Sequence, residues 1–191
     1  MNDQSKFVSD IQKIRKRVRE QVDKGATNTT YGLDRDSVIR MLNEALATEL
    51  VCTLRYRRHF FVAAGMASES VKAEFLEHAQ QEQEHADQIA ARIVQLGGSP
   101  NFNPDGLALR SHAEYIEGET LTEMIREDLI AERIAIESYR EMVDFFGAHD
   151  PSTRRMLEGI LAVEEEHAED MASLLAGRSE SGGASQVAGS R

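Results

Sequence analysis

The chain has 191 residues, enough for one domain with a sizeable hydrophobic core. Its formal net charge of −11 argues against a surface that binds nucleic acid generally and suits a protein that attracts cations. The single cysteine, Cys52, excludes an intramolecular disulfide, and no apolar run approaches the ~20 residues that span a bilayer. The N-terminus is polar and basic and lacks the apolar core of a secretory signal, so we expect a cytoplasmic protein with no membrane partner.

Residues 1–30 predict a basic extension that is partly helical. Within residues 5–22, apolar residues recur at helical spacing, at Phe7, Ile11, Ile14 and Val18. The same segment is locally basic, with Lys13, Arg15, Lys16, Arg17 and Arg19. The favoured interpretation is a helix that packs on the body of the protein or on a neighbouring subunit. An arm that contacts DNA phosphates is a less favoured interpretation, and a mobile segment is the third.

Residues 31–177 predict a bundle of four long helices, expected at about residues 34–64, 68–96, 119–146 and 151–176. Polar caps or a proline precede these segments and glycines follow them, a combination typical of helix ends. The closing glycines are Gly65, Gly97, Gly147 and Gly177. The tail at 178–191 is rich in Ser, Gly and Ala, and we expect it to be disordered.

The link at residues 98–118 is far too long for a tight hairpin. At ~3.3 Å per extended residue it can run the ~40 Å length of a long helix. The second and third helices are then parallel and joined by one crossover, and a short helix is expected within the link at about residues 109–116.

Each long helix places one glutamate in its apolar stripe: Glu49, Glu82, Glu132 and Glu164. The second and fourth helices add a histidine three residues later, as Glu82-x-x-His85 and Glu164-x-x-His167. Residues three apart share a helix face, so each carboxylate and imidazole point into the same space. Two single glutamates with two Glu-x-x-His pairs form the dinuclear carboxylate constellation of ferritin-like four-helix bundles.

The four carboxylates predict a metal centre because burying them together without cations would be costly. Two divalent cations would balance their charge with both histidines neutral. Carboxylate oxygens with one imidazole per ion suit iron or manganese, whereas structural zinc sites more often use cysteine. We therefore expect two iron ions per subunit, with manganese as the alternative metal.

Several residues near these ligands receive other interpretations. Tyr56 and Tyr139 each follow a ligand glutamate by seven residues. Tyr56 is the candidate catalytic residue, as a hydrogen-bond donor to a bridging carboxylate or as an electron donor, whereas Tyr139 is at least as well interpreted as a core aromatic. Cys52 is interpreted as a small buried side chain and His78 as a core or boundary histidine beside the same cavity, not a ligand. The glutamates off the stripe, Glu84, Glu165 and Glu166, are expected to be solvated.

Four segments resemble the helix motifs of bacterioferritin and its Dps-like relatives, over about residues 34–176. They are Glu-Leu-Val-x4-Tyr from Glu49, Glu-x-x-His-Ala-Asp from Glu82, Asp-Leu-x-x-Glu from Asp128 and Glu-Glu-x-His from Glu164. The resemblance implies an all-α, ferritin-like four-helix bundle whose dinuclear centre lies within one subunit. It implies that Glu82 and Glu164 bridge the two ions. Glu49 with His85, and Glu132 with His167, would then complete one ion each.

The sequence also departs from bacterioferritin. Gln83 stands where that family has its haem-ligating Met, so we do not expect haem. Gln81 and Val163 stand where it has an Asp before each Glu-x-x-His, so the groups that orient the histidines must differ. The tail after Gly177 offers no apolar face for the fifth helix of 24-subunit ferritins. A homo-oligomer of twelve subunits is therefore favoured over one of 24.

The function implied is iron storage and detoxification, in which Fe²⁺ is oxidised by O₂ or H₂O₂ and Fe³⁺ is mineralised in a cage. The alternative is a stand-alone dinuclear iron or manganese oxidase, peroxidase or hydroxylase. The rubredoxin-like module of rubrerythrin-type peroxidases is missing, and manganese catalases are usually longer. A third class, a DNA-compacting protein, depends only on the basic residues of the extension.

Overall fold

The computed structural model describes residues 11–24, 31–63 and 68–184, and these residues are helical or irregular, with no strands among them. A short basic helix, α1 (Ile11–Arg19), and a 3₁₀ turn, η2 (Val22–Lys24), precede the bundle. The bundle consists of α2 (Arg35–Val62), α3 (Ser68–Gln95), α5 (Leu121–Phe146) and α6 (Pro151–Ala184), with the short α4 (Leu107–Arg110) between α3 and α5. The predicted all-α architecture is confirmed.

Polar residues cap the starts of α2 and α5, and a glycine follows the end of α5. Asp34 caps α2 by accepting a hydrogen bond from the Ser37 amide at 3.0 Å. Thr120 and Glu123 form a reciprocal capping box at the start of α5. Gly147 ends α5 with a φ of 45°, a backbone conformation that glycine adopts without steric cost.

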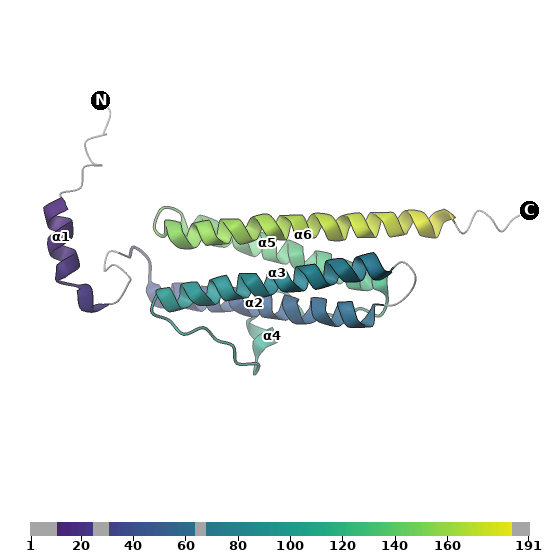
Figure 1. Cartoon of the computed structure of the whole chain (residues 1–191), viewed down its shortest axis with the longest axis horizontal. Coiled ribbons are helices and arrows are strands. Elements are labelled where there is room, and N and C mark those ends of the chain that lie inside the picture. Colours follow the sequence, from purple (N-terminus) through teal and green to yellow (C-terminus); the bar gives the residue numbers. More distant parts are fainter. Residues whose placement is uncertain (1–10, 25–30, 64–67, 185–191) are drawn as a thin grey trace, which may run out of the picture.

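The bundle is built from two antiparallel helix pairs. α2 packs mainly on α3, and α5 packs mainly on α6. In Figure 1 the chain leaves α3 at one end of the bundle and returns along its length, so that α3 and α5 run in the same direction. The predicted crossover between parallel second and third helices is confirmed. None of the helices in the described part of the chain combines the length and apolarity needed to cross a membrane.

Among the described residues, apolar side chains form two large cores, one in each half of the bundle, and a small cluster of Cys52, Ala113 and Ala131. The first includes Leu42, Ile89 and Leu157, and the second includes Phe75 and Met171. All five side chains are fully buried. Between the two cores, at mid-length, every long helix carries buried charged residues, so the polar centre is enclosed by apolar packing on both sides.

A buried ion pair fastens the crossover to the bundle. Arg55 Nε donates to Asp128 Oδ1 at 2.8 Å, and His59 Nδ1 lies 2.8 Å from the other carboxylate oxygen of Asp128. One further nitrogen of each side chain reaches the crossover: Arg55 Nη1 donates to the carbonyl of Glu114 at 2.9 Å, and His59 Nε2 lies 2.8 Å from the carbonyl of Glu117. These contacts hold the start of α5 against α2.

The short helix of the crossover lies at Leu107–Arg110, and the prediction of a helix at about residues 109–116 is wrong. Gly106, with a φ of 69°, turns the chain into α4, and Arg110 closes the loop by donating to the carbonyl of Asn103 at 2.8 Å. Beyond α4 the chain is irregular, and the carbonyls of Glu114 and Glu117 accept hydrogen bonds from Arg55 and Arg58 of α2.

The last helix is longer than predicted. α6 continues through Gly177 to Ala184, so the predicted helix end at Gly177 and the predicted disorder of residues 178–184 are wrong. Gly177 does not adopt a positive φ, and nothing lies within 4 Å of the position its Cβ would take. The helix therefore continues without steric conflict. Residues 185–191 lie outside the described residues, and the division into domains stays a prediction.

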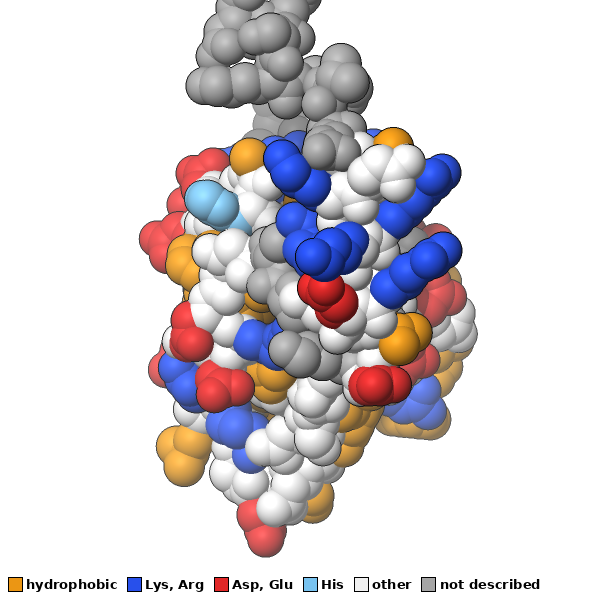
Figure 2. Space-filling model, turned by 90° about the vertical axis from the view of Figure 1, so that its left-hand side faces the viewer, with side chains coloured by type: hydrophobic (Ala, Val, Ile, Leu, Met, Phe, Trp, Pro, Cys, Tyr) orange, Lys and Arg blue, Asp and Glu red, His pale blue; other side chains and the backbone are white. Residues whose placement is uncertain are grey.

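The basic helix α1 buries none of its residues, and Figure 1 places it beside one end of the bundle. Residues 5–10 of the predicted helix lie outside the described residues. Figure 2 views the molecule from this end, and Lys and Arg side chains gather on it. Because none of its residues is buried, the structure does not support the prediction that α1 packs on its own bundle.

Candidate metal centre

The six predicted ligands come together at the middle of the bundle. Each long helix contributes one carboxylate, and α3 and α6 each add an imidazole one turn later. All six side chains are buried, with at most 4% of any residue exposed: Glu49, Glu82, His85, Glu132, Glu164 and His167. They fall into two overlapping groups that could each hold a metal ion, Glu49–Glu82–His85–Glu164 and Glu82–Glu132–Glu164–His167.

Glu82 and Glu164 belong to both groups, and each divides its two oxygens between the two histidines. Glu164 Oε1 lies 2.9 Å from His85 Nδ1, and Glu164 Oε2 lies 3.5 Å from His167 Nδ1. Glu82 Oε2 lies 3.7 Å from His85 Nδ1, and Glu82 Oε1 lies 3.7 Å from His167 Nδ1. This is the placement expected of two carboxylates that bridge a pair of ions.

The other two glutamates each serve one half of the cluster. Glu49 Oε2 lies 3.3 Å from His85 Nδ1, and Glu132 Oε2 lies 3.8 Å from His167 Nδ1. Their second oxygens accept hydrogen bonds from the two tyrosines across the bundle. Tyr56 of α2 donates to Glu132 of α5, and Tyr139 of α5 donates to Glu49 of α2. The two tyrosines thus hold equivalent positions in the two halves. The prediction that they bond a bridging carboxylate, Glu82 or Glu164, is wrong.

The two histidines are oriented differently. His167 Nε2 donates to Gln81 Oε1 at 2.7 Å, which fixes the proton on Nε2 and leaves the Nδ1 lone pair directed at the cluster. Val163 occupies the position on α6 that corresponds to Gln81 on α3, and it offers no such acceptor. Gln81 therefore replaces the missing aspartate on one side only.

Burial and mutual repulsion change the pKa values of the cluster. Burial raises the pKa of Glu49 well above its usual range, and the charge of Glu82 adds to the rise. Burial and the charge of Glu49 raise the pKa of Glu164 to about 7. Burial alone would lower the pKa of both histidines, but contacts with the carboxylates outweigh it and raise the pKa of His85 and of His167 to about 12. Without metal, protons on the imidazoles neutralise part of the carboxylate charge.

The donor set fits two divalent cations. Seven buried atoms of the cluster lack a hydrogen-bond partner within the described part of the chain: Glu49 Oε2, Glu82 Oε1, His85 Nδ1, Glu132 Oε2, both Glu164 oxygens and His167 Nδ1. Buried polar atoms are normally paired, so a group of unpaired ones directed at a common space indicates a ligand. Carboxylate oxygen with imidazole nitrogen suits iron or manganese.

Other predicted environments can be compared directly with the structure. Glu84, Glu165 and Glu166 are exposed and Cys52 is buried, as predicted. Sequence reasoning missed the buried Arg55 and His59. Asp128 could have indicated them, because a carboxylate in the apolar stripe of α5 needs a partner that neutralises or binds it.

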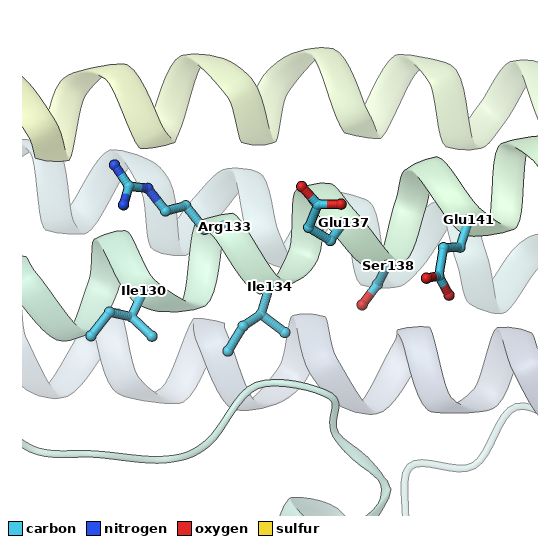
Figure 3. Close-up of a pocket in the computed structure, with 6 residues that line it drawn as sticks. All are labelled: Ile130, Arg133, Ile134, Glu137, Ser138 and Glu141. Carbon is cyan, nitrogen blue, oxygen red and sulfur yellow. The ribbon is translucent and has the colours of Figure 1, made fainter.

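A surface groove on α5 lies apart from the buried cluster. Figure 3 shows Ile130, Ile134 and Ser138 following one another at one-turn intervals, with Arg133, Glu137 and Glu141 beside them. The groove contains none of the cluster's ligands. Its apolar residues on a single helix are better suited to contact with another protein surface than to metal binding.

The fold and the site define a class: an all-helical bundle that encloses a cluster of four glutamates and two histidines between its helix pairs. A family profile described as the ferritin-like domain matches residues 39–178, and the chain belongs to this family. This membership confirms the resemblance predicted from the four helix motifs.

Curated relatives and solved structures agree with the assignment. A bacterioferritin of Rhodobacter capsulatus is 32% identical over 132 residues, which cover 68% of this chain and 77% of that protein. A nutrient stress-induced DNA-binding protein of Synechococcus sp. is 34% identical over 140 residues, covering 71% and 78%. The solved structure of a bacterioferritin-related protein from Bacteroides fragilis, described as a dodecameric thioferritin, matches with a TM-score of 0.76 at 28% identity, covering 91% of this chain and 98% of that one.

Proposed function

We propose that this chain oxidises Fe²⁺ with O₂ or H₂O₂ at the carboxylate–histidine cluster and stores the Fe³⁺ inside an oligomeric cage. The observation that carries the proposal is the set of unpaired, buried donor atoms shared between two overlapping ligand groups. Membership of the ferritin-like domain family and the similarity to bacterioferritins support it.

In this mechanism the protein binds two Fe²⁺ as substrate and orients them. Glu82 and Glu164 each offer one oxygen to each ion, because each carboxylate faces both histidines. Glu49 with His85, and Glu132 with His167, complete the two halves. Bound iron supplies the electrons, one from each ion, that reduce the oxidant. The carboxylates act as ligands, and the apolar cores on both sides limit the access of water.

The tyrosines and Gln81 position these ligands. Tyr56 and Tyr139 each donate to the carboxylate oxygen that faces away from the histidines, so the other oxygen stays available to iron. Gln81 holds His167 in the tautomer that presents Nδ1. We propose that Tyr56 supplies a further electron where O₂ accepts more than the two electrons that the pair of iron ions provides.

Aerobic loading of metal-free protein with Fe²⁺ tests the proposal, with bound iron counted per chain after desalting. We expect uptake far beyond the two ions that the cluster accommodates, and Glu82→Ala should slow it. Glu84→Ala, which changes an exposed glutamate of the same helix, is the matched control. Iron that stops at two per chain would favour a stand-alone dinuclear oxidase, peroxidase or hydroxylase instead.

We propose a cage of twelve subunits, by analogy with the dodecameric protein of Bacteroides fragilis. The α5 groove of Figure 3 is a suitable subunit contact because Ile130 is exposed at its end and Phe145, one further exposed apolar residue of α5, lies beyond it. Light scattering coupled to gel filtration measures the mass. A mass near 24 chains, or a monomer, would contradict this assembly.

A second candidate function, contact with DNA, is favoured by the exposed basic residues of α1 and by the DNA-binding relative in Synechococcus sp.. Phosphate contacts by lysine and arginine weaken steeply with salt. Gel retardation of the protein against Arg15→Glu/Arg19→Glu tests the arm. An identical gel shift for both proteins would show that α1 does not contribute to DNA binding.

A further inference from the structure

A second group of metal-ligating side chains lies beside the cluster, between α3 and α6. His78 Nε2 is 3.4 Å from Asp170 Oδ2 and 4.0 Å from Glu74 Oε2. The histidine is buried, with 2% of its side chain exposed, whereas the side chains of Asp170 and Glu74 are 52% and 39% exposed. The group therefore leads from the surface into the bundle.

Hydrogen bonding fixes which nitrogen of His78 faces the two acids. Its Nδ1 lies 3.2 Å from the hydroxyl of Tyr56, and that hydroxyl donates its only proton to Glu132. The tyrosine oxygen can then only accept, so His78 Nδ1 must carry the proton. In the neutral ring this leaves the Nε2 lone pair directed at two carboxylates, which are also acceptors. Either a proton on Nε2 or a metal ion shared with the two carboxylates can close this contact, and the grouping of all three ligand atoms favours the ion.

The spacing of these atoms suits a single metal ion. Two ligands at about 2.1 Å from an ion in tetrahedral geometry are about 3.4 Å apart. The separations of 3.4 and 4.0 Å from the imidazole nitrogen therefore need little adjustment of the two exposed carboxylates. One imidazole with two carboxylates is a donor set for Fe²⁺, Mn²⁺, Co²⁺ or Zn²⁺.

This group exists on only one side of the otherwise repeated site. In α6 the positions equivalent to Glu74 and His78 hold Met156 and Ile160, and in α3 the position equivalent to Asp170 holds Gln88. The helix repeat that generates the dinuclear cluster therefore does not account for the group.

The group also adjoins one particular ligand of the cluster. The rings of His78 and His167 stack, with centroids 3.9 Å apart and planes 22° apart. We propose that Glu74, His78 and Asp170 form a third divalent-cation site, which holds Fe²⁺ at the surface before it enters the His167 half of the cluster. The staging role depends on the function proposed above, whereas the binding site itself does not.

Titration of metal-free protein with Co²⁺, followed by calorimetry and by the visible absorbance of the bound ion, tests the site. Wild-type protein should bind three Co²⁺ per chain, one for each of the three ligand groups. Asp170→Asn changes an exposed residue and should lower the affinity of one ion by about 10-fold or more, leaving two. Glu169→Gln removes the same charge from the adjacent exposed residue and should leave all three.

The outcomes separate this inference from the proposed function. Binding of only two Co²⁺ by wild-type protein would overturn the third site. Binding of three Co²⁺ by Asp170→Asn would overturn it as well. Glu82→Gln should lose the ions of the cluster and keep the third. A single ion in wild-type protein that Asp170→Asn abolishes would support the third site and contradict the dinuclear cluster. Slower Co²⁺ uptake by the cluster in Asp170→Asn than in Glu169→Gln supports staging, and equal rates exclude it.

Discussion

Metal ions should stabilise the bundle strongly, because its centre contains four buried carboxylates that repel one another and ligand atoms that lack hydrogen-bond partners. Seven such atoms lie at the cluster without a partner among the described residues. Unsatisfied buried polar groups cost about 1–3 kcal/mol each, and more when charged. Adding Co²⁺, which O₂ does not readily oxidise in such a site, to the metal-free protein isolates this effect from iron chemistry.

The size of the stabilisation follows from binding to the folded state only. At a free Co²⁺ concentration of 100 times the dissociation constant, each site contributes about 2.7 kcal/mol, so two sites contribute about 5 kcal/mol. For a domain of this size, 1 kcal/mol raises Tm by roughly 2–4 °C. We therefore expect the two ions of the cluster to raise the melting temperature by roughly 10–20 °C, to which an ion at the proposed third site adds.

Scanning calorimetry with and without Co²⁺ measures the shift. Glu82→Gln/Glu164→Gln removes both bridging charges while keeping the side-chain shape, and it should reduce the shift by more than half. Glu84→Gln/Glu166→Gln changes two exposed glutamates on the same helices and should preserve it. An equal shift in both double variants would refute the assignment of the bridging ligands.

Three further predictions test the surroundings of the site. Arg55→Met leaves Asp128 buried without its guanidinium and should lower the free energy of unfolding by about 3–5 kcal/mol in urea titrations; a loss under about 1 kcal/mol would contradict the pairing. Gln81→Leu removes the acceptor that fixes the His167 tautomer and should lower the binding affinity for one Co²⁺ by about 10–100-fold. An unchanged affinity would contradict this role of Gln81. Because the pKa of His85 and of His167 is raised to about 12, both bind protons at pH 7 that a metal must displace, and the raised pKa values of Glu49 and Glu164 add to this proton uptake. Calorimetry in buffers of different ionisation enthalpy should show release of at least two protons per chain and affinity that falls as pH falls, whereas no release would contradict the protonated state.

Much of the fold could be predicted because helix ends are set by local chemistry. The cap Asp34 and the glycine Gly147 act within one turn of their own positions, so the sequence alone reveals them. The end of α6 could not be predicted in the same way. Gly177 is a frequent helix terminator, but at this position no positive φ is adopted and the helix continues.

The candidate ligands were equally accessible to sequence reasoning, since Glu-x-x-His spacing is a property of a single helix. Contacts between helices depend on their relative height and rotation, which the sequence does not provide. The crossed pairs Tyr56–Glu132 and Tyr139–Glu49 belong to this class, and so does the stacking of His78 on His167. Charge balance supplied the number of ions and the resemblance to bacterioferritin supplied the bridging roles, and both stay proposals.

The central claim is that Glu82 and Glu164 bridge two metal ions at the middle of the bundle. Crystals of the protein soaked with Fe²⁺ without oxygen, and measured at the iron absorption edge, test it most directly. We predict two anomalous peaks about 3.5–4 Å apart, each beside one of the two cluster histidines and both in contact with Glu82 and Glu164. Iron found only at the surface, or a single ion bound by one histidine, would contradict the account.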